Sequence, residues 1–167
     1  MYIVLDVDST IANNKHREHL LKKRPKDWEA FHEPSLVIKD EVIEGVVRVL
    51  EHFKQLKHTF VVLTGRHERL RDTTMRWLNE RLPFNIPDTH LRMRPDGNML
   101  SGAEAKRQQI INFKVSLNDN RAEFLFIDDD YRAREALKDL GIVLQAPQCW
   151  DLLFPKAPEA PEEENLK

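Results

Sequence analysis

Apolar runs of strand length recur along this chain. They cover residues 1–5, 59–63, 123–127 and 142–144 and are rich in Val, Ile, Leu and Phe, and residues 90–94 form a weaker candidate. Runs with little polar alternation are typical of strands that are buried on both faces of a parallel sheet. The pattern therefore predicts a sheet built from these five segments.

Between these runs, apolar side chains recur at intervals of three and four residues. Such stripes cover residues 42–53, 70–82, 103–115 and 133–140, and each predicts a helix with one apolar face. Strands that alternate with helices imply right-handed crossovers. We therefore expect an α/β fold with an open, mostly parallel sheet and helices on both faces, whose ligand site lies at the carboxyl ends of the strands.

Length and composition agree with one compact domain, which we expect at residues 1–154 of the 167. Residues 155–167 combine prolines with glutamates, and this composition predicts a disordered tail. The apolar runs are too short to cross a bilayer, no secretory leader is recognisable, and Cys149 is the single cysteine. These features predict a cytoplasmic protein that has no membrane partner.

Polar clusters follow three of the predicted strands. They are Asp6 with Asp8, Thr64 with Arg66, and Asp128 with Asp129. Because the carboxyl ends of parallel strands meet at one edge of a sheet, we expect the clusters to converge. Crowded carboxylates repel one another unless a cation lies among them, and hard oxygen ligands favour Mg²⁺. A carboxylate can also attack phosphorus when cations neutralise the developing charge, and Lys106 is the candidate cation.

Four segments resemble, in order, the motifs of the haloacid dehalogenase superfamily of phosphohydrolases. They are Asp6-Val7-Asp8-Ser9-Thr10, Thr64-Gly65-Arg66, Lys106 and Asp128-Asp129. The resemblance implies that Asp6 is the nucleophile and that Asp8 protonates the leaving group and later activates water. It also implies that Thr64 holds a phosphoryl oxygen, while Lys106 steadies the nucleophile and the phosphate.

The same resemblance implies where the cofactor and the phosphate bind. The expected magnesium ligands are Asp6, Asp8, Asp128 and Asp129, with Asp129 the first choice, and Ser9, Thr10 and Gly65 should line the phosphate site. Ser9 stands where the family usually has glycine, and we expect the tight loop to tolerate it. Asp130 should cap the following helix instead of binding metal.

A closer resemblance is to the phosphatase domain of phage-type polynucleotide kinase/phosphatase, which removes 3′-phosphates from nucleic-acid ends. Arg17, eleven positions after Asp6, and Arg66 match two arginines of that group. Gly102 departs from it, because the group tends to have an acid four residues before the lysine, and Glu104 is the nearest substitute. The sequence has no Gly-x-x-x-x-Gly-Lys-Ser/Thr phosphate-binding loop, so we expect the phosphatase half alone.

Residues 13–40 occupy the place where the superfamily can insert a cap, and their length predicts at most a short helical flap over an open site. The net charge of the chain is −2, yet residues 13–26 are strongly basic and could contact phosphates. Trp28 and Phe31 could stack a base, although anchoring a short helix on the domain is the commoner role.

The expected function is a Mg²⁺-dependent phosphomonoester hydrolase that works through an aspartyl-phosphate and removes 3′-phosphate from polynucleotide ends. A nucleotidase that acts on nucleoside monophosphates is an alternative, and a catalytically silent nucleic-acid-binding module is an alternative of another class. The resemblance suggests a phage-encoded protein that acts in the host cytoplasm. The sequence leaves the oligomeric state open.

Overall fold

The computed structural model describes residues 1–146 and 149–150. The end of the predicted domain, 151–154, and the predicted tail, 155–167, lie outside the described residues. Among the described residues, no helix combines the length and the apolar character that crossing a bilayer demands.

Five parallel strands form the central sheet, as the apolar runs predict. They are β1 (Tyr2–Leu5), β4 (Thr59–His67), β5 (Leu91–Arg94), β6 (Phe124–Asp128) and β7 (Ile142–Gln145), in the order β5-β4-β1-β6-β7. The central strand β1 pairs with β4 and with β6. Residues that follow β1 therefore lie beside the ends of both neighbours, and this edge is where polar groups gather.

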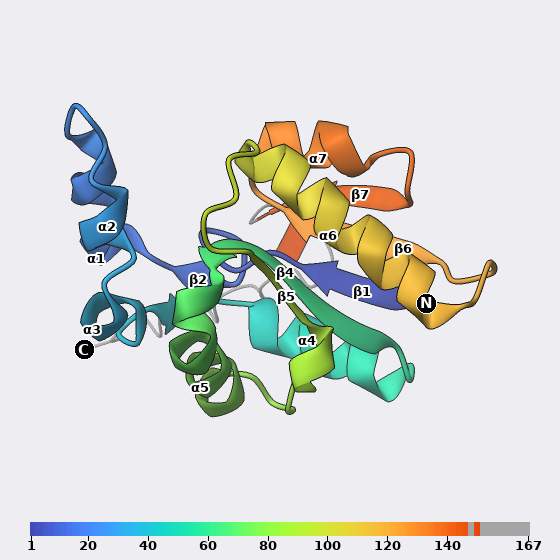
Figure 1. Cartoon of the computed structure of the whole chain (residues 1–167). Coiled ribbons are helices and arrows are strands. Elements are labelled where there is room, and N and C mark those ends of the chain that lie inside the picture. Colours follow the sequence, from blue (N-terminus) through green and yellow to red (C-terminus); the bar gives the residue numbers. More distant parts are fainter. Residues whose placement is uncertain (147–148, 151–167) are drawn as a thin grey trace, which may run out of the picture.

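Helices cover both faces of the sheet (Figure 1). They are α4 (Val46–Gln55) and α5 (Arg71–Arg81) on one face, and α6 (Gly102–Leu117) and α7 (Tyr131–Leu137) on the other. Alternate residues of β1 serve the two cores: Ile3 packs in the cluster with Leu50, and Val4 in the cluster with Ile110. This two-sided burial explains why the strands are apolar throughout.

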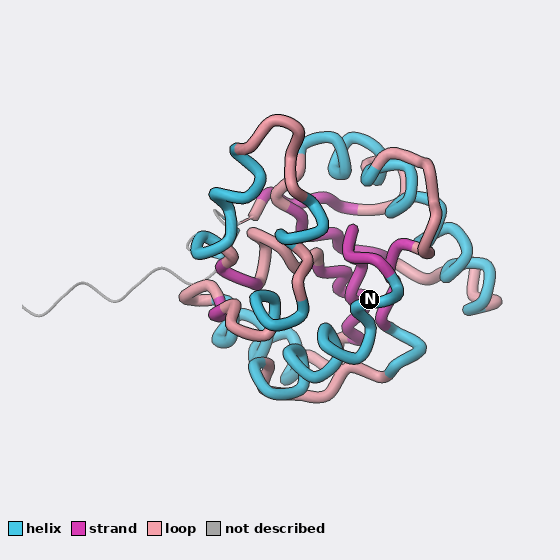
Figure 2. The backbone as a smooth tube through the Cα atoms, turned by 60° about the vertical axis from the view of Figure 1, so that its left-hand side comes forward, coloured by secondary structure: helices cyan, strands magenta, loops and turns pink. Residues whose placement is uncertain are grey.

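The flap, residues 13–40, is closed at its base by a two-stranded antiparallel ribbon. β2 (Ala12–Asn13) pairs with β3 (Glu41–Val42). Between them lie four short helical segments, α1 (Lys15–Glu18), η1 (His19–Lys22), α2 (Trp28–Phe31) and α3 (Pro34–Val37). Figure 2 shows these short helices set beside the strands, at the end of the molecule toward which β1 points in Figure 1.

Two predicted boundaries differ from the structure. The helix predicted from residue 42 begins at Val46, because Val42 belongs to β3 and Gly45 takes a left-handed φ of 87° before the first turn. The strand predicted to end at Leu63 runs on to His67, so Thr64-Gly65-Arg66 lies within β4. The predicted strand at 90–94 is confirmed from Leu91, after the 3-10 turn η3 (Asp88–His90); a second such turn, η2 (Glu68–Leu70), precedes α5.

Candidate active site

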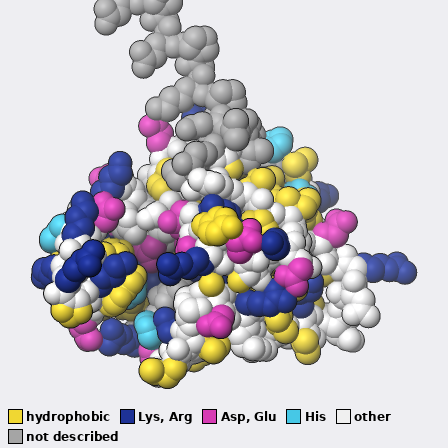
Figure 3. Space-filling model, turned by 90° about the horizontal axis from the view of Figure 1, so that it is seen from above, with side chains coloured by type: hydrophobic (Ala, Val, Ile, Leu, Met, Phe, Trp, Pro, Cys, Tyr) yellow, Lys and Arg dark blue, Asp and Glu magenta, His cyan; other side chains and the backbone are white. Residues whose placement is uncertain are grey.

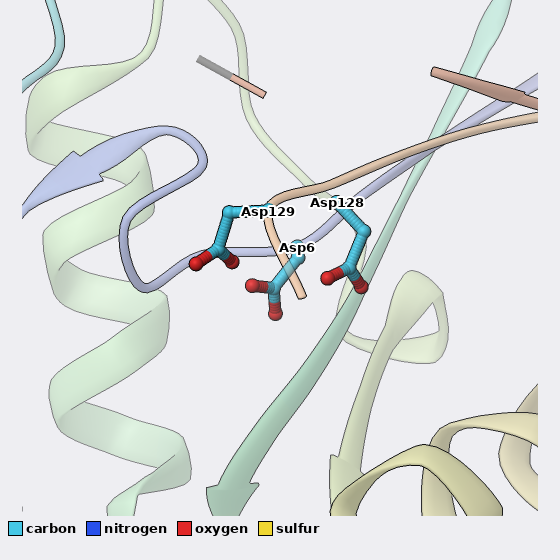
Figure 4. Close-up of side chains that lie close together, drawn as sticks. All are labelled: Asp6, Asp128 and Asp129. Carbon is cyan, nitrogen blue, oxygen red and sulfur yellow. The ribbon is translucent and has the colours of Figure 1, made fainter. Parts of the chain in front are cut away.

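Three carboxylates meet beyond the ends of β1 and β6. Asp6 follows β1, Asp128 ends β6, and the register that pairs Leu5 with Ile127 brings them together with Asp129. One oxygen from each of the three lies within 4.8 Å of the others, and the side chains point toward a common space (Figure 4). The convergence expected from the strand ends is therefore present.

Lys106 supplies a positive charge to this cluster from the first turns of α6. Its Nζ lies 2.9 Å from Asp6 Oδ1 and 2.6 Å from Asp128 Oδ2, and the side chain is buried. A capping box between Ser101 and Glu104 fixes the start of the helix. The Glu104 carboxylate thus accepts from the Ser101 backbone N–H at the start of the helix.

Thr10 joins the loop after β1 to the loop after β6. Its Oγ1 lies 3.4 Å from Asp6 Oδ2 and 3.3 Å from Asp129 Oδ1, and it accepts a hydrogen bond from the Asp129 backbone N–H. Ser9 adopts a left-handed φ of 63°, which turns this loop sharply. The position is one where glycine fits without strain, and serine nevertheless maintains the turn.

Burial raises the pKa values of these carboxyl groups. It raises the pKa of Asp6 to about 7, with further contributions from Asp128 and Asp8, although Lys106 opposes the shift. Burial and then the charge of Asp6 raise the pKa of Asp129 to about 6. Burial acts to lower the pKa of Lys106, but Asp6 and Asp128 outweigh it and raise the pKa, which keeps the ammonium charged. The cluster thus resists full ionisation without another cation.

The donor chemistry of the site fits a hard divalent cation such as Mg²⁺. Three acidic side chains and one basic side chain meet in it, namely Asp6, Asp128, Asp129 and Lys106. With all of them ionised, two negative charges are unbalanced, which one divalent cation would neutralise. Carboxylate oxygens are the ligands that Mg²⁺ prefers. Asp6, Asp128 and Asp129 are the residues that could hold it.

Asp8 faces a different set of partners, although it had been predicted among the metal ligands. Arg66 donates to both of its oxygens, from Nε to Oδ2 at 2.9 Å and from Nη2 to Oδ1 at 2.8 Å, and Arg17 Nη2 donates to Oδ1 as well. Two guanidinium groups thus occupy its carboxylate, which lies outside the cluster of three. Burial acts to raise the pKa of Asp8, but Arg66 and Arg17 hold it well below the usual range.

Asp40 belongs to this network, although we did not predict it from the sequence. It is fully buried and accepts from Arg17 Nε at 2.8 Å, from Arg17 Nη2 at 2.6 Å and from Arg66 Nη2 at 2.9 Å. Its backbone carbonyl accepts from the indole of Trp77. Asp40 belongs to no motif and is the last residue of the flap. The sequence shows only an acid next to a strand, and this feature is too common to indicate a functional residue.

Three further predicted residues, Thr64, Gly65 and Asp130, have mainly local contacts. The Thr64 hydroxyl is buried and accepts a hydrogen bond from the Arg66 backbone N–H at 3.2 Å, and Gly65 separates the two in β4. Arg66 Nη1 is buried and has no hydrogen-bond partner among the described residues. Asp130 caps α7 by accepting from Arg132 N, as predicted.

The fold and the site define a phosphatase of the haloacid dehalogenase type, a phosphoric monoester hydrolase. The family described as the polynucleotide kinase PNKP phosphatase domain matches residues 1–149, and the chain belongs to this family. No curated protein matches the chain.

Solved structures share the fold at low sequence identity. One is the structure of the Pnkp1/Rnl/Hen1 RNA repair complex, with a TM-score of 0.61 and 19% identity over 86% of this chain; the chain spans 41% of the length of that protein. A second is the class C acid phosphatase from Bacillus anthracis, with a TM-score of 0.58 and 16% identity over 93% of this chain and 73% of that one. The same phosphatase with tungstate bound gives a TM-score of 0.56 and 16% identity over 94% and 74%.

Proposed function

We propose that this phosphatase removes the 3′-phosphate from a polynucleotide end through an aspartyl-phosphate on Asp6. The observation that carries the proposal is the buried Asp6–Lys106 pair in a domain of the PNKP phosphatase family. A carboxylate held 2.9 Å from an ammonium is ionised more readily, and an ionised carboxylate can attack phosphorus.

In the first half of the reaction, an oxygen of Asp6 attacks phosphorus in line with the bond to the leaving oxygen. The new O–P bond gives the aspartyl-phosphate, and the departing alkoxide takes a proton from Asp8. In the second half, water attacks the same phosphorus and loses a proton to Asp8, while the Asp6–phosphorus bond breaks. Lys106 and Thr64 would contact the phosphoryl oxygens.

Asp8 must gain a proton before it can act as the acid, and its two arginine partners oppose this. A bound phosphate dianion offers Arg66 and Arg17 a competing acceptor. Because hydrogen bonds to an ionised carboxylate lower its pKa, sharing the guanidinium groups with the phosphate raises the pKa of Asp8. Substrate binding would in this way prepare the acid, and Arg66 Nη1 is a donor that is already without a partner among the described residues.

Mg²⁺ held by Asp6, Asp128 and Asp129 would supply charge stabilisation for the phosphoryl oxygens. The support lies in the three converging carboxylates and in the two unbalanced negative charges of the site.

Three features support a polynucleotide end as the substrate. The first is the family, and the second is that one structural neighbour with the same fold belongs to an RNA repair complex. The third is the surface of the flap, where Lys and Arg side chains gather at the left of Figure 3. The exposed Lys and Arg side chains of the flap are Lys15, Lys22, Lys23, Arg24, Lys26 and Lys39. Such a surface favours phosphate backbones without regard to sequence.

The test combines one variant with a panel of substrates. Asp6→Asn should abolish phosphate release while the far-ultraviolet circular dichroism is unchanged, and Asp139→Asn, at an exposed ion pair with Arg107, should behave as wild type. Substantial turnover by pure Asp6→Asn protein would refute the assignment of Asp6 as the nucleophile.

The panel of substrates contains a 3′-phosphorylated oligonucleotide, 3′- and 5′-mononucleotides, and sugar phosphates. Best turnover of mononucleotides would indicate a nucleotidase instead, and failure to hydrolyse any of them would indicate a silent binding module.

A further inference from the structure

A cavity of about 470 Å³ lies between the flap and the loops that follow β4 and β5. This volume is in the range of small-molecule sites. Its lining comes from α2 of the flap and from the ends of two strands, namely Trp28, Glu29, His32, His67, Arg69, Asp96 and Gly97. None of these residues belongs to the catalytic cluster or to the arginine network around Asp8.

Trp28 presents a large aromatic surface to this cavity. Its side chain is 51% exposed, whereas Phe31 of the same helix is buried, so the two aromatic residues have separate roles. Phe31 lies under Arg17, with the guanidinium 4.1 Å from the ring centroid, and anchors the helix. It also meets the indole of Trp28 edge-on at 5.9 Å, which fixes the orientation of the exposed ring.

The rest of the cavity carries neutral and charged hydrogen-bonding groups. The rings of His32 and Trp28 lie nearly parallel, 6.0 Å apart, and the rings of His32 and His67 are 6.4 Å apart. Burial lowers the pKa of His32 to about 4, so its imidazole is neutral at neutral pH and can both donate and accept. Arg69 and Asp96 add a cation and an anion at the rim, where they pair with Glu29 and His67.

The cavity lies next to the groups that bind Asp8, the proposed general acid. His32 directly follows Phe31, whose carbonyl accepts from Arg17 at 2.8 Å, and His67 directly follows Arg66, which binds Asp8. The charges of Asp8, Arg66 and Arg17 all act on His32. Because Asp8 is the proposed proton donor to the leaving oxygen, the organic part of the substrate has to extend on the side of Asp8.

We propose that this cavity is a nucleobase subsite, in which Trp28 stacks on the base of the nucleotide that carries the scissile phosphate. The inference rests on the proposed function, since it takes the leaving group to be a nucleotide. The Lys26 ammonium lies 5.4 Å from the Trp28 ring centroid and would have to move aside for a base. The indole is then a suitable platform because every base has a π-face, and the stack would carry little base preference. His32 and His67 would contribute hydrogen bonds to the sugar or to the base edge.

The first experiment measures binding through tryptophan fluorescence. Of the three tryptophans, Trp77 and Trp150 are fully buried, so the exposed Trp28 should report contact with a base. Asp6→Asn protein is titrated with a 3′-phosphorylated dinucleotide, and with the same compound lacking its 3′-terminal base. Quenching by the first compound and not by the second supports the subsite, provided that Trp28→Phe removes the signal. Equal quenching by both compounds, or none by either, overturns it.

The second experiment measures phosphate release with the active enzyme. Trp28→Ala should lower kcat/KM for the intact oligonucleotide by about tenfold, a typical loss for one stacked base, and should leave the abasic substrate nearly unaffected. Trp28→Phe should retain most of the activity. Leu56→Ala is the matched control, because Leu56 is 53% exposed and lies at the end of α4.

The outcomes separate this inference from the proposed function. An equal loss on both substrates would assign Trp28 a merely structural role, and no loss on either would exclude base contact; in both cases the 3′-phosphatase proposal stands. If the wild-type enzyme releases phosphate from neither oligonucleotide, the proposed function fails, and the subsite fails with it.

Discussion

Arg66 Nη2 donates to Asp40 Oδ2 at 2.9 Å, so the last residue before β3 is bonded to the strand that carries the second motif. The same nitrogen lies 2.8 Å from Asp8 Oδ1. Asp40 therefore shares the guanidinium groups that bind the proposed acid, and it fixes where they point. We propose that it acts as a positioning residue, through Arg17 and Arg66.

Replacing Asp40 with Asn should destabilise the protein strongly. The change removes the buried negative charge between two buried guanidinium groups, and breaking one side of such a network costs about 3–5 kcal/mol. Urea denaturation measures the loss. Asp139→Asn, which breaks an exposed pair with Arg107, should cost less than about 1 kcal/mol. Equal losses of unfolding free energy in the two variants would show that the buried contacts of Asp40 contribute no more to stability than an exposed ion pair does.

Mg²⁺ should stabilise the protein more at high pH than at low pH. The pKa values of Asp6 and Asp129 are raised above their unfolded values, so their contribution to stability is present below about pH 4 and is lost as the pH rises through 6 to 7. A cation that binds the ionised groups offsets this loss.

Thermal unfolding with and without Mg²⁺, at about pH 5 and about pH 8, tests the linkage. At saturation of about a hundredfold over Kd, the gain should approach about 2.7 kcal/mol at the higher pH, and Asp129→Asn should abolish most of it. A larger effect of Mg²⁺ at the lower pH would contradict the assignment of these carboxylates to the metal.

Lys106→Met should remove nearly all activity on every phosphomonoester. Without the ammonium, Asp6 and Asp128 lose their shared cation, and the pKa of Asp6 rises further, which protonates the nucleophile. We expect kcat to fall by at least about a hundredfold, which is the scale of losing one group that stabilises transition-state charge. Steady-state kinetics on an aryl phosphate measures it. Lys138→Met, at an exposed pair with Glu135, is the matched control and should leave kcat unchanged.

Gly141→Ala should destabilise the fold, although it lies far from any proposed catalytic residue in the sequence. A Cβ at this position would come within 2.3 Å of the Phe124 carbonyl oxygen in β6, and the backbone there cannot yield easily. Gly102→Ala is the control, because a Cβ there meets nothing within 4 Å. The midpoint of urea denaturation should fall for the first variant and not for the second. Comparable midpoints would show that the loop between α7 and β7 is free to shift.

How much could be predicted from the sequence depended on whether a residue stands beside a regular element. Asp6 and Asp128 were identifiable because each adjoins an unbroken apolar strand, and parallel pairing then brings them together. The start of α4 was predicted too early, because Val42 continues the apolar stripe although Gly45 breaks the helix. No stripe marks Asp40, whose importance comes from long-range contacts alone.

The sequence also did not reveal which side chains of the flap are buried. Its basic composition was plain, yet Arg17 is completely buried while its basic neighbours are exposed. A short helix distributes successive residues around its axis, and four residues give too few turns for a periodic pattern to show which one faces inward. For the same reason Trp28 and Phe31 could not be separated until their surroundings were known.

The ribbon of β2 and β3 has a consequence for how this domain can vary. It brings the two ends of the flap together, and an insertion with adjacent ends can usually be lengthened, shortened or exchanged without disturbing the scaffold. Here that freedom is restricted, since Arg17 and Asp40 both belong to the flap: Arg17 balances the charge of Asp8, and Asp40 holds Arg17 in place. Any substitute cover would have to bring its own counter-charges, so recognition of the substrate and the chemistry of the acid are expected to change together.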